Sequence, residues 1–142
     1  MFENNIHYKA IKHKAHKYIV LMITFFEISR YKNLMALEID HEFYAIRNGV
    51  LTAKVDYMWD GPSGPTRDDK TNIRASLPHD IIYQAIGEQE KIKKLSLWKK
   101  YRIRREADKL FKRVLKEDGM NWFRRQGYFI AVRGFGAFFA HW

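Results

Sequence analysis

The sequence predicts an α+β fold, with a small antiparallel sheet from the N-terminal half packed by about three helices from the C-terminal half. β-Branched and aromatic residues concentrate before residue 57, whereas apolar residues at helical spacing dominate after residue 71. The length of 142 residues suits a single domain, and a hydrophobic content of 46% is enough to build its core. We therefore expect one domain over residues 1–142.

The N-terminal half is expected to form strands. Residues 1–17 carry loosely spaced apolar positions and predict a helix or an arm. Asn48-Gly49 is a typical hairpin turn between two strands. The two prolines and two glycines within 58–70 indicate an ordered loop. The expected strands, all within 18–57, cover residues 18–28, 35–40, 42–46 and 50–57.

Residues 71–142 are expected to be helical. Pro78 should start, break or kink a helix over 72–89. A long helix is predicted over 90–118, with Gly119 as its C-terminal cap. One or two further helices are expected over 122–140. The apolar stripe of the long helix consists of Ile103, Ala107, Leu110, Phe111, Val114 and Leu115.

Composition excludes several classes of site. The chain has no cysteine, so disulfides, thiolate metal sites and cysteine nucleophiles are absent. The longest apolar run, residues 18–26, is far shorter than the roughly 20 residues needed to span a bilayer. No signal-peptide cleavage site follows it. We expect a soluble protein that is not secreted through a signal peptide.

The positive charge is confined to one segment. Residues 91–116 hold twelve Lys or Arg against two acidic residues, which gives +10, and the remaining 14 basic and 14 acidic residues sum to zero. Trp98 and Tyr101 are interleaved with these cations. Two interpretations stay open: a solvated helix face, or a docking surface for an acidic protein or a nucleic acid. The candidate partner-binding residues are Lys93, Lys94, Lys99, Lys100, Arg102, Arg104 and Arg105.

Three short motifs occur in order along the chain: Trp59-Asp60-Gly61-Pro62-Ser63-Gly64-Pro65, His79-Asp80-x-x-Tyr83 and Ala107-Asp108-x-x-Phe111. In these residues the chain resembles a small, uncharacterised bacteriophage and prophage domain family marked by W-D-G-x-S-x-P, H-D-x-x-Y and A-D-x-x-F. The resemblance implies a phage source and a fold, and it brings no established activity.

The motif residues support two interpretations. The favoured one is a buried polar network that ties the loop to two helices. The alternative is a site for a hard divalent ion held by Asp60, His79, Asp80 and Asp108, with His79, Asp80 and Asp108 catalytic in a hydrolase. No cofactor is expected under the favoured interpretation. The network would comprise Trp59, Asp60, Ser63, His79, Asp80, Tyr83 and Asp108.

The sequence thus favours a non-enzymatic phage accessory protein. We expect it to be virion-associated or assembly-related, and to dock on another phage or host protein through the basic helix. The alternatives are a metal-dependent hydrolase acting on cell wall or a phosphate ester, and a nucleic-acid-binding protein. The expected location is the host cytoplasm, extending to the virion. The partner's identity and the oligomeric state do not follow from the sequence.

Overall fold

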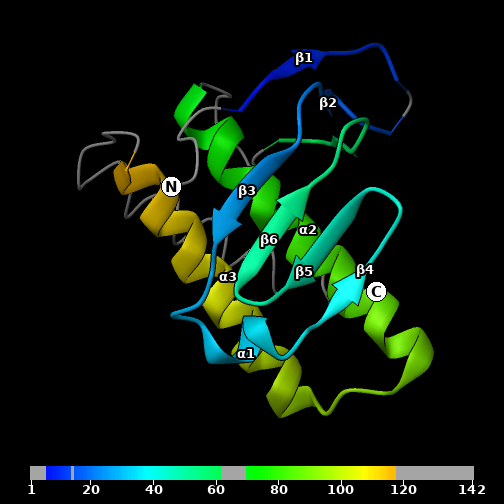
Figure 1. Ribbon diagram of the computed structural model, residues 1–142, viewed down its shortest axis with the longest axis vertical. Helices are drawn as coiled ribbons and strands as arrows, with labels where there is room; N and C mark the ends of the chain where they lie inside the picture. The colour runs from blue at the N-terminus through cyan, green and yellow to red at the C-terminus, as the bar shows by residue number, and fades with distance from the viewer. Residues whose placement is uncertain (1–5, 14, 62–69, 118–142) are drawn as a thin grey trace.

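A computed structural model of the chain describes residues 6–13, 15–61 and 70–117, and it confirms the α+β class (Figure 1). Strands come first and the two long helices follow. The elements are β1 (Tyr8–Ala10), β2 (Tyr18–Val20), β3 (Thr24–Glu27), α1 (Lys32–Met35), β4 (Ile39–Asp40), β5 (Tyr44–Arg47), β6 (Val50–Ala53), β7 (Met58–Trp59), α2 (Lys70–Ile92) and α3 (Leu97–Glu117).

The described strands form two antiparallel sheets. One has the order β1-β2-β7 and the other the order β3-β6-β5-β4. In Figure 1, α2 crosses behind the four-stranded sheet, and α3 runs beside it. The two long helices pack against each other, and α1 contacts α3. The sheet therefore has a helical layer on one side.

The hairpin between β5 and β6 is confirmed at Asn48-Gly49. Arg47 pairs with Val50, so two residues make the turn. Asn48 has φ 50° and Gly49 has φ 76°. Two consecutive positive φ values are what a type I′ turn requires, and Asn-Gly adopts them readily.

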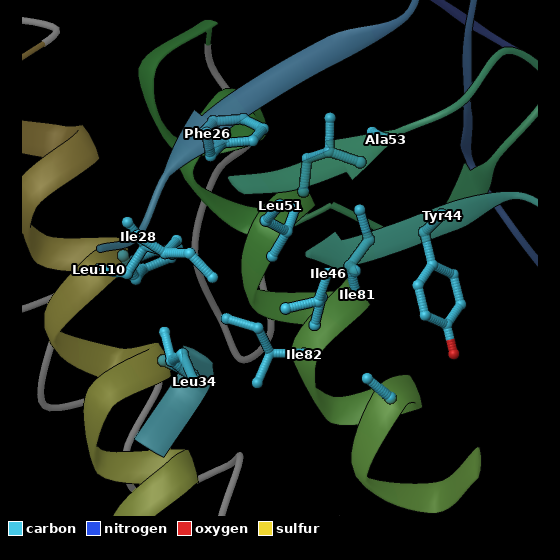
Figure 2. Close-up of a cluster of buried hydrophobic side chains, with 14 of the residues drawn as sticks. Phe26, Ile28, Leu34, Tyr44, Ile46, Leu51, Ala53, Ile81, Ile82 and Leu110 are labelled. Carbon is cyan, nitrogen blue, oxygen red and sulfur yellow. The ribbon is translucent and has the colours of Figure 1, made fainter. Parts of the chain in front are cut away.

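The main core lies between the four-stranded sheet and the helices (Figure 2). Alternation along β6 buries Leu51 and Ala53 while their neighbours are partly exposed. Ile81 and Ile82 from α2 and Leu110 from α3 meet these strand residues, and each is 0% exposed. Burying one such side chain is worth about 1.5–3 kcal/mol, so this interface holds the helices on the sheet.

Residues 1–17 were expected to form a helix or an arm, and the described residues among them form β1 and irregular backbone rather than a helix. Tyr8 pairs with Val20 of β2. The Tyr8 ring also packs edge-on against Tyr18 at 5.7 Å and against Trp59 at 6.1 Å. The strand pairing and the aromatic packing involve residues of β2 and β7, which a local sequence pattern does not report. These contacts outweigh the weak helical spacing of the apolar residues.

Two further boundaries differ from the prediction. The strand expected over residues 18–28 is divided at 21–23, because β2 and β3 belong to different sheets. The strand expected over 35–40 is shorter, and helix α1 precedes it. The Glu106 carboxylate accepts the backbone N–H of Asn33 at 2.7 Å and of Leu34 at 3.2 Å. A carboxylate at these unsatisfied donors stabilises the start of a helix.

The range 90–118, which was predicted as one long helix, is divided between two helices. α2 ends at Ile92, and α3 begins at Leu97 after an irregular connection. Ser96 caps α3, because its hydroxyl accepts the backbone N–H of Lys99 at 3.1 Å. Pro78 neither begins nor ends α2, although it cannot donate to the carbonyl of Arg74.

Some predictions fall outside the described residues, among them Ser63, most of the 58–70 loop and the helix expected over 122–140. Within the described part of the chain, no helix combines the length and apolar character needed to cross a membrane.

Candidate functional site

A buried ion pair joins the two long helices. His79 Nε2 of α2 lies 2.7 Å from Asp108 Oδ1 of α3. The side chains are 5% and 4% exposed. His79 lies one residue after Pro78, and Asp108 interrupts the apolar face of α3 between Ala107 and Leu110. Helix packing therefore brings together two motifs that are 29 residues apart.

Aromatic rings enclose this pair. The Tyr83 ring lies 4.4 Å from the imidazole, and its hydroxyl donates to Asp108 Oδ1 at 3.5 Å. Phe111 packs edge-on against the imidazole at 5.7 Å. Tyr83 follows His79 by four residues and Phe111 follows Asp108 by three, so each lies one helical turn beyond its motif partner. The side chains of the H-D-x-x-Y and A-D-x-x-F motifs therefore form one cluster.

Asp80 provides a second carboxylate beside the imidazole. Asp80 Oδ1 lies 4.0 Å from His79 Nδ1. The backbone N–H of Asp60 donates to the Asp80 carboxylate. The Asp60 side chain itself is 61% exposed and pairs with His16 at 3.1 Å. The structure therefore brings His79, Asp80 and Asp108 together, and it brings only the backbone of Asp60 to them.

The electrostatics favour a charged imidazole. Burial by itself lowers the pKa of His79, but the hydrogen bonds and charges of Asp108 and Asp80 outweigh it and raise the pKa to about 9. Burial raises the pKa of Asp80, partly offset by its hydrogen bond with His79. His79 is therefore protonated at neutral pH and has N–H groups directed to both carboxylates.

Trp59 is anchored separately. Its indole Nε1 donates to the Ser76 hydroxyl at 3.0 Å, and Ser76 donates to the carbonyl of Ile73 at 2.7 Å. Trp59 is 1% exposed. This contact ties the end of β7 to the first turns of α2. Ser76 was not among the predicted network residues, because a serine inside a helix carries no distinctive sequence signal.

The geometry of the His79 cluster suits an internal ion pair better than a reactive centre. A protonated imidazole has no lone pair with which to bind a metal or accept a proton. No group of three or more His, Cys, Asp or Glu side chains in the described segments is arranged to hold a metal ion. At 5% and 4% exposure, the two side chains present little surface to a substrate.

A second candidate site is the outer face of α3, opposite its buried residues. Positions that follow each other by four, three, four, three and four residues share one side of a helix. We call this set the α3 outer face. Its members are Trp98, Arg102, Arg105, Lys109, Lys112 and Lys116, and we add Tyr101, which lies beside them three residues after Trp98.

The acidic residues of α3 all bond to other residues of the fold. Glu106 caps α1, Asp108 pairs with His79, and Glu117 lies 3.4 Å from Arg113. On the outer face, Arg102, Arg105, Lys109 and Lys116 are exposed and form no ion pair with any residue in the described part of the chain. The positive charge of these four side chains is therefore not paired with an acidic side chain in the described residues.

The predicted partner-binding residues separate into two groups. Lys93 and Lys94 of the α2–α3 connection are exposed, as are Lys99, Arg102 and Arg105 of α3. Lys100 instead pairs with Glu90 at 2.7 Å, and Arg104 donates to the Lys100 carbonyl at 3.3 Å. The outer face continues through Lys109, Lys112 and Lys116, which the prediction left out. Their regular spacing with Arg102 and Arg105 is the sequence signal that identifies them.

Together these features define an α+β domain with a buried histidine–aspartate pair and a cationic helix face. Residues 64–132 match the sequence model of a family described as a protein of unknown function, DUF1353. The match includes the His79-Asp80-x-x-Tyr83 and Ala107-Asp108-x-x-Phe111 motifs and begins after Ser63. No curated protein and no solved structure matches the chain.

Proposed function

We propose that this chain is a non-enzymatic binding module that docks on an anionic macromolecular partner through the α3 outer face. The proposal rests on one observation: four exposed cations of this face, Arg102, Arg105, Lys109 and Lys116, form no ion pair with any described residue, while Glu106, Asp108 and Glu117 of α3 each bond to another residue of the fold. Uncompensated charge on a rigid helix attracts and orients an anionic partner.

The biological setting forms part of the same proposal. The resemblance of the three motifs to a phage and prophage family supports an accessory protein of a bacteriophage. Such a protein would act in the host cytoplasm during assembly, or be carried in the virion. The partner would be a phage or host macromolecule with a negatively charged surface.

The burial of the pair supports a structural rather than a catalytic role for the His79-Asp80-x-x-Tyr83 and Ala107-Asp108-x-x-Phe111 motifs. His79 and Asp108 lie inside the α2–α3 interface, and their polar atoms are directed at each other. In this proposal the pair fixes α3 against α2 so that the outer face stays in position. A hydrolase centred on His79 is the weaker alternative, because the imidazole is enclosed and positively charged.

Fractionation of infected cells tests the proposal. The wild-type chain should sediment with phage particles or with a larger assembly, and Arg105→Glu/Lys109→Glu should move to the free-protein fractions. The control Lys9→Glu/Lys12→Glu makes the same change in net charge at exposed residues of the N-terminal region, and it should behave as wild type. A wild-type chain that stays in the free fractions throughout infection would contradict the proposal.

A further inference from the structure

We infer that the partner of the α3 outer face is a single-stranded nucleic acid, with phosphates bound along the cations and bases stacked at the aromatic end. This inference rests on the proposed docking function and names its partner class. It draws on the spacing of the cations, on four of them that are exposed and form no ion pair with any described residue, and on the placement of two exposed aromatic rings.

The spacing of the cations matches a polyanionic chain. Arg102, Arg105, Lys109, Lys112 and Lys116 follow one another at intervals of three or four residues. With a rise of about 1.5 Å per residue, neighbouring cations are about 4.5–6 Å apart, and the row is about 21 Å long. Phosphates of a stacked strand lie about 3.4 Å apart along the axis, and farther apart when the strand is extended. The row therefore spans about four to six phosphates.

Four cations of this row, Arg102, Arg105, Lys109 and Lys116, are exposed. The inner cations of the segment are used within the fold: Lys100 pairs with Glu90, and Arg113 donates to the Glu27 carbonyl at 2.5 Å. Carboxylates do not share the outer face with the row, because Glu106, Asp108 and Glu117 lie on other sides of α3. A continuous cationic row without interspersed acids suits a uniform polyanion better than a protein surface of mixed charge.

Two aromatic rings lie at the N-terminal end of the row. Trp98 is 62% exposed and Tyr101 is 42% exposed. Their ring planes are 18° apart with centroids separated by 5.4 Å, and the Arg102 guanidinium lies 5.0 Å from the Trp98 centroid. Exposed aromatic rings beside cations are the usual means of binding unpaired bases. A duplex would use the charges alone, because its bases are already stacked, so a single strand fits better.

Fluorescence anisotropy on the full-length chain tests this inference. The probes are a labelled deoxythymidine oligonucleotide of about 20 residues, a duplex of equal length and a poly-glutamate peptide. We expect the oligonucleotide to bind most tightly, with log K falling by about 3 for each tenfold increase in salt if four or five phosphates are contacted. Trp98→Ala should weaken single-strand binding by about tenfold and change duplex binding much less.

Matched variants separate a specific row from general charge. Arg105→Glu/Lys109→Glu should lower the affinity for the oligonucleotide by about tenfold or more. Lys9→Glu/Lys12→Glu should change this affinity by less than about threefold. Thermal unfolding of each variant checks that it is folded. Equal effects of the two double variants, or no effect of Trp98→Ala, would overturn the inference.

Different results would contradict the nucleic-acid inference and the docking function. If the wild-type chain ignores the oligonucleotide at low salt but still co-sediments in infected cells through the α3 outer face, the nucleic-acid inference is wrong and an acidic protein partner stands. If the poly-glutamate peptide binds as tightly as the oligonucleotide and with the same dependence on Trp98, the inference is also wrong. Loss of both oligonucleotide binding and co-sedimentation overturns the docking function itself.

Discussion

His79 and Asp108 place opposite charges in the interior between α2 and α3. Taking these charges out of water is costly, and the pair is stable only while both partners remain. The hydrogen bond of 2.7 Å and the nearby Tyr83 and Asp80 compensate the two groups. Removing one partner leaves the other buried without compensation, so the effect on stability should be large.

Asp108→Asn should lower the free energy of unfolding by about 3 kcal/mol, because it removes the charge that balances the buried imidazolium. Urea denaturation measures this directly. Asp60→Asn is the matched control: its side chain pairs with His16 at the surface and should change stability by less than about 1 kcal/mol. Equal losses for the two variants would show that the buried pair has no special role.

The same pair predicts how stability depends on pH. The pKa of His79 is raised from its ordinary value of 6.5 to about 9. Its contribution is therefore fully present below about pH 6.5 and is lost as pH rises through about 9. The free energy of unfolding of the wild type should fall across this interval relative to His79→Gln. A constant difference between the two proteins from pH 6 to pH 10 would contradict a protonated imidazole.

Among the elements, the β5–β6 hairpin and α1 differ in how far local sequence determines them. Asn48-Gly49 supplies the positive φ values of the turn from within the hairpin, so the turn could be predicted. The start of α1 is capped by Glu106, which lies 73 residues from Asn33. No local pattern reports that contact, and the sequence around Met35 was therefore assigned to a strand.

Two glycine substitutions, one in the β5–β6 turn and one in α2, should change stability in opposite directions. Gly49→Ala should lower stability by about 1–2 kcal/mol, because φ is 76° and the new Cβ would lie 3.1 Å from the Ser29 Cβ. Gly87→Ala, with nothing within 4 Å of its new Cβ, should raise stability by up to about 1 kcal/mol. Thermal unfolding of both variants provides the comparison. Similar changes of the same sign would contradict the turn geometry.

The cap on α1 gives a third test at this scale. Glu106→Gln removes the negative charge of the carboxylate that accepts the backbone N–H groups of Asn33 and Leu34. The free energy of unfolding should fall by about 1 kcal/mol. Amide hydrogen exchange at Leu34 should become faster. Glu38→Gln, at an exposed position in the same region, is the control and should leave exchange unchanged. Unchanged protection of Leu34 in Glu106→Gln would show that the carboxylate does not hold α1.

For the whole molecule, the fold class could be predicted from the order of the strand and helix patterns in the sequence. The residues that make up the two candidate sites could be predicted only in part. The sequence placed His79, Asp80 and Asp108 together, since their motifs fall on adjacent helices. It did not reveal that the Asp60 side chain turns outward to His16. The inward positions of Lys100 and Arg104 follow only once α3 is known to begin at Leu97, because that start defines the helix faces.

We propose that the His79–Asp108 pair supports the fold while the α3 outer face binds the partner. The most direct test measures thermal unfolding and oligonucleotide binding on two variants, Asp108→Asn and Arg105→Glu/Lys109→Glu. We expect Asp108→Asn to have a lower midpoint of unfolding and still to bind the oligonucleotide when it is assayed well below that midpoint. The outer-face variant should unfold like wild type and lose binding. The opposite pattern, with binding abolished by Asp108→Asn in folded protein and retained by the outer-face variant, would contradict the account.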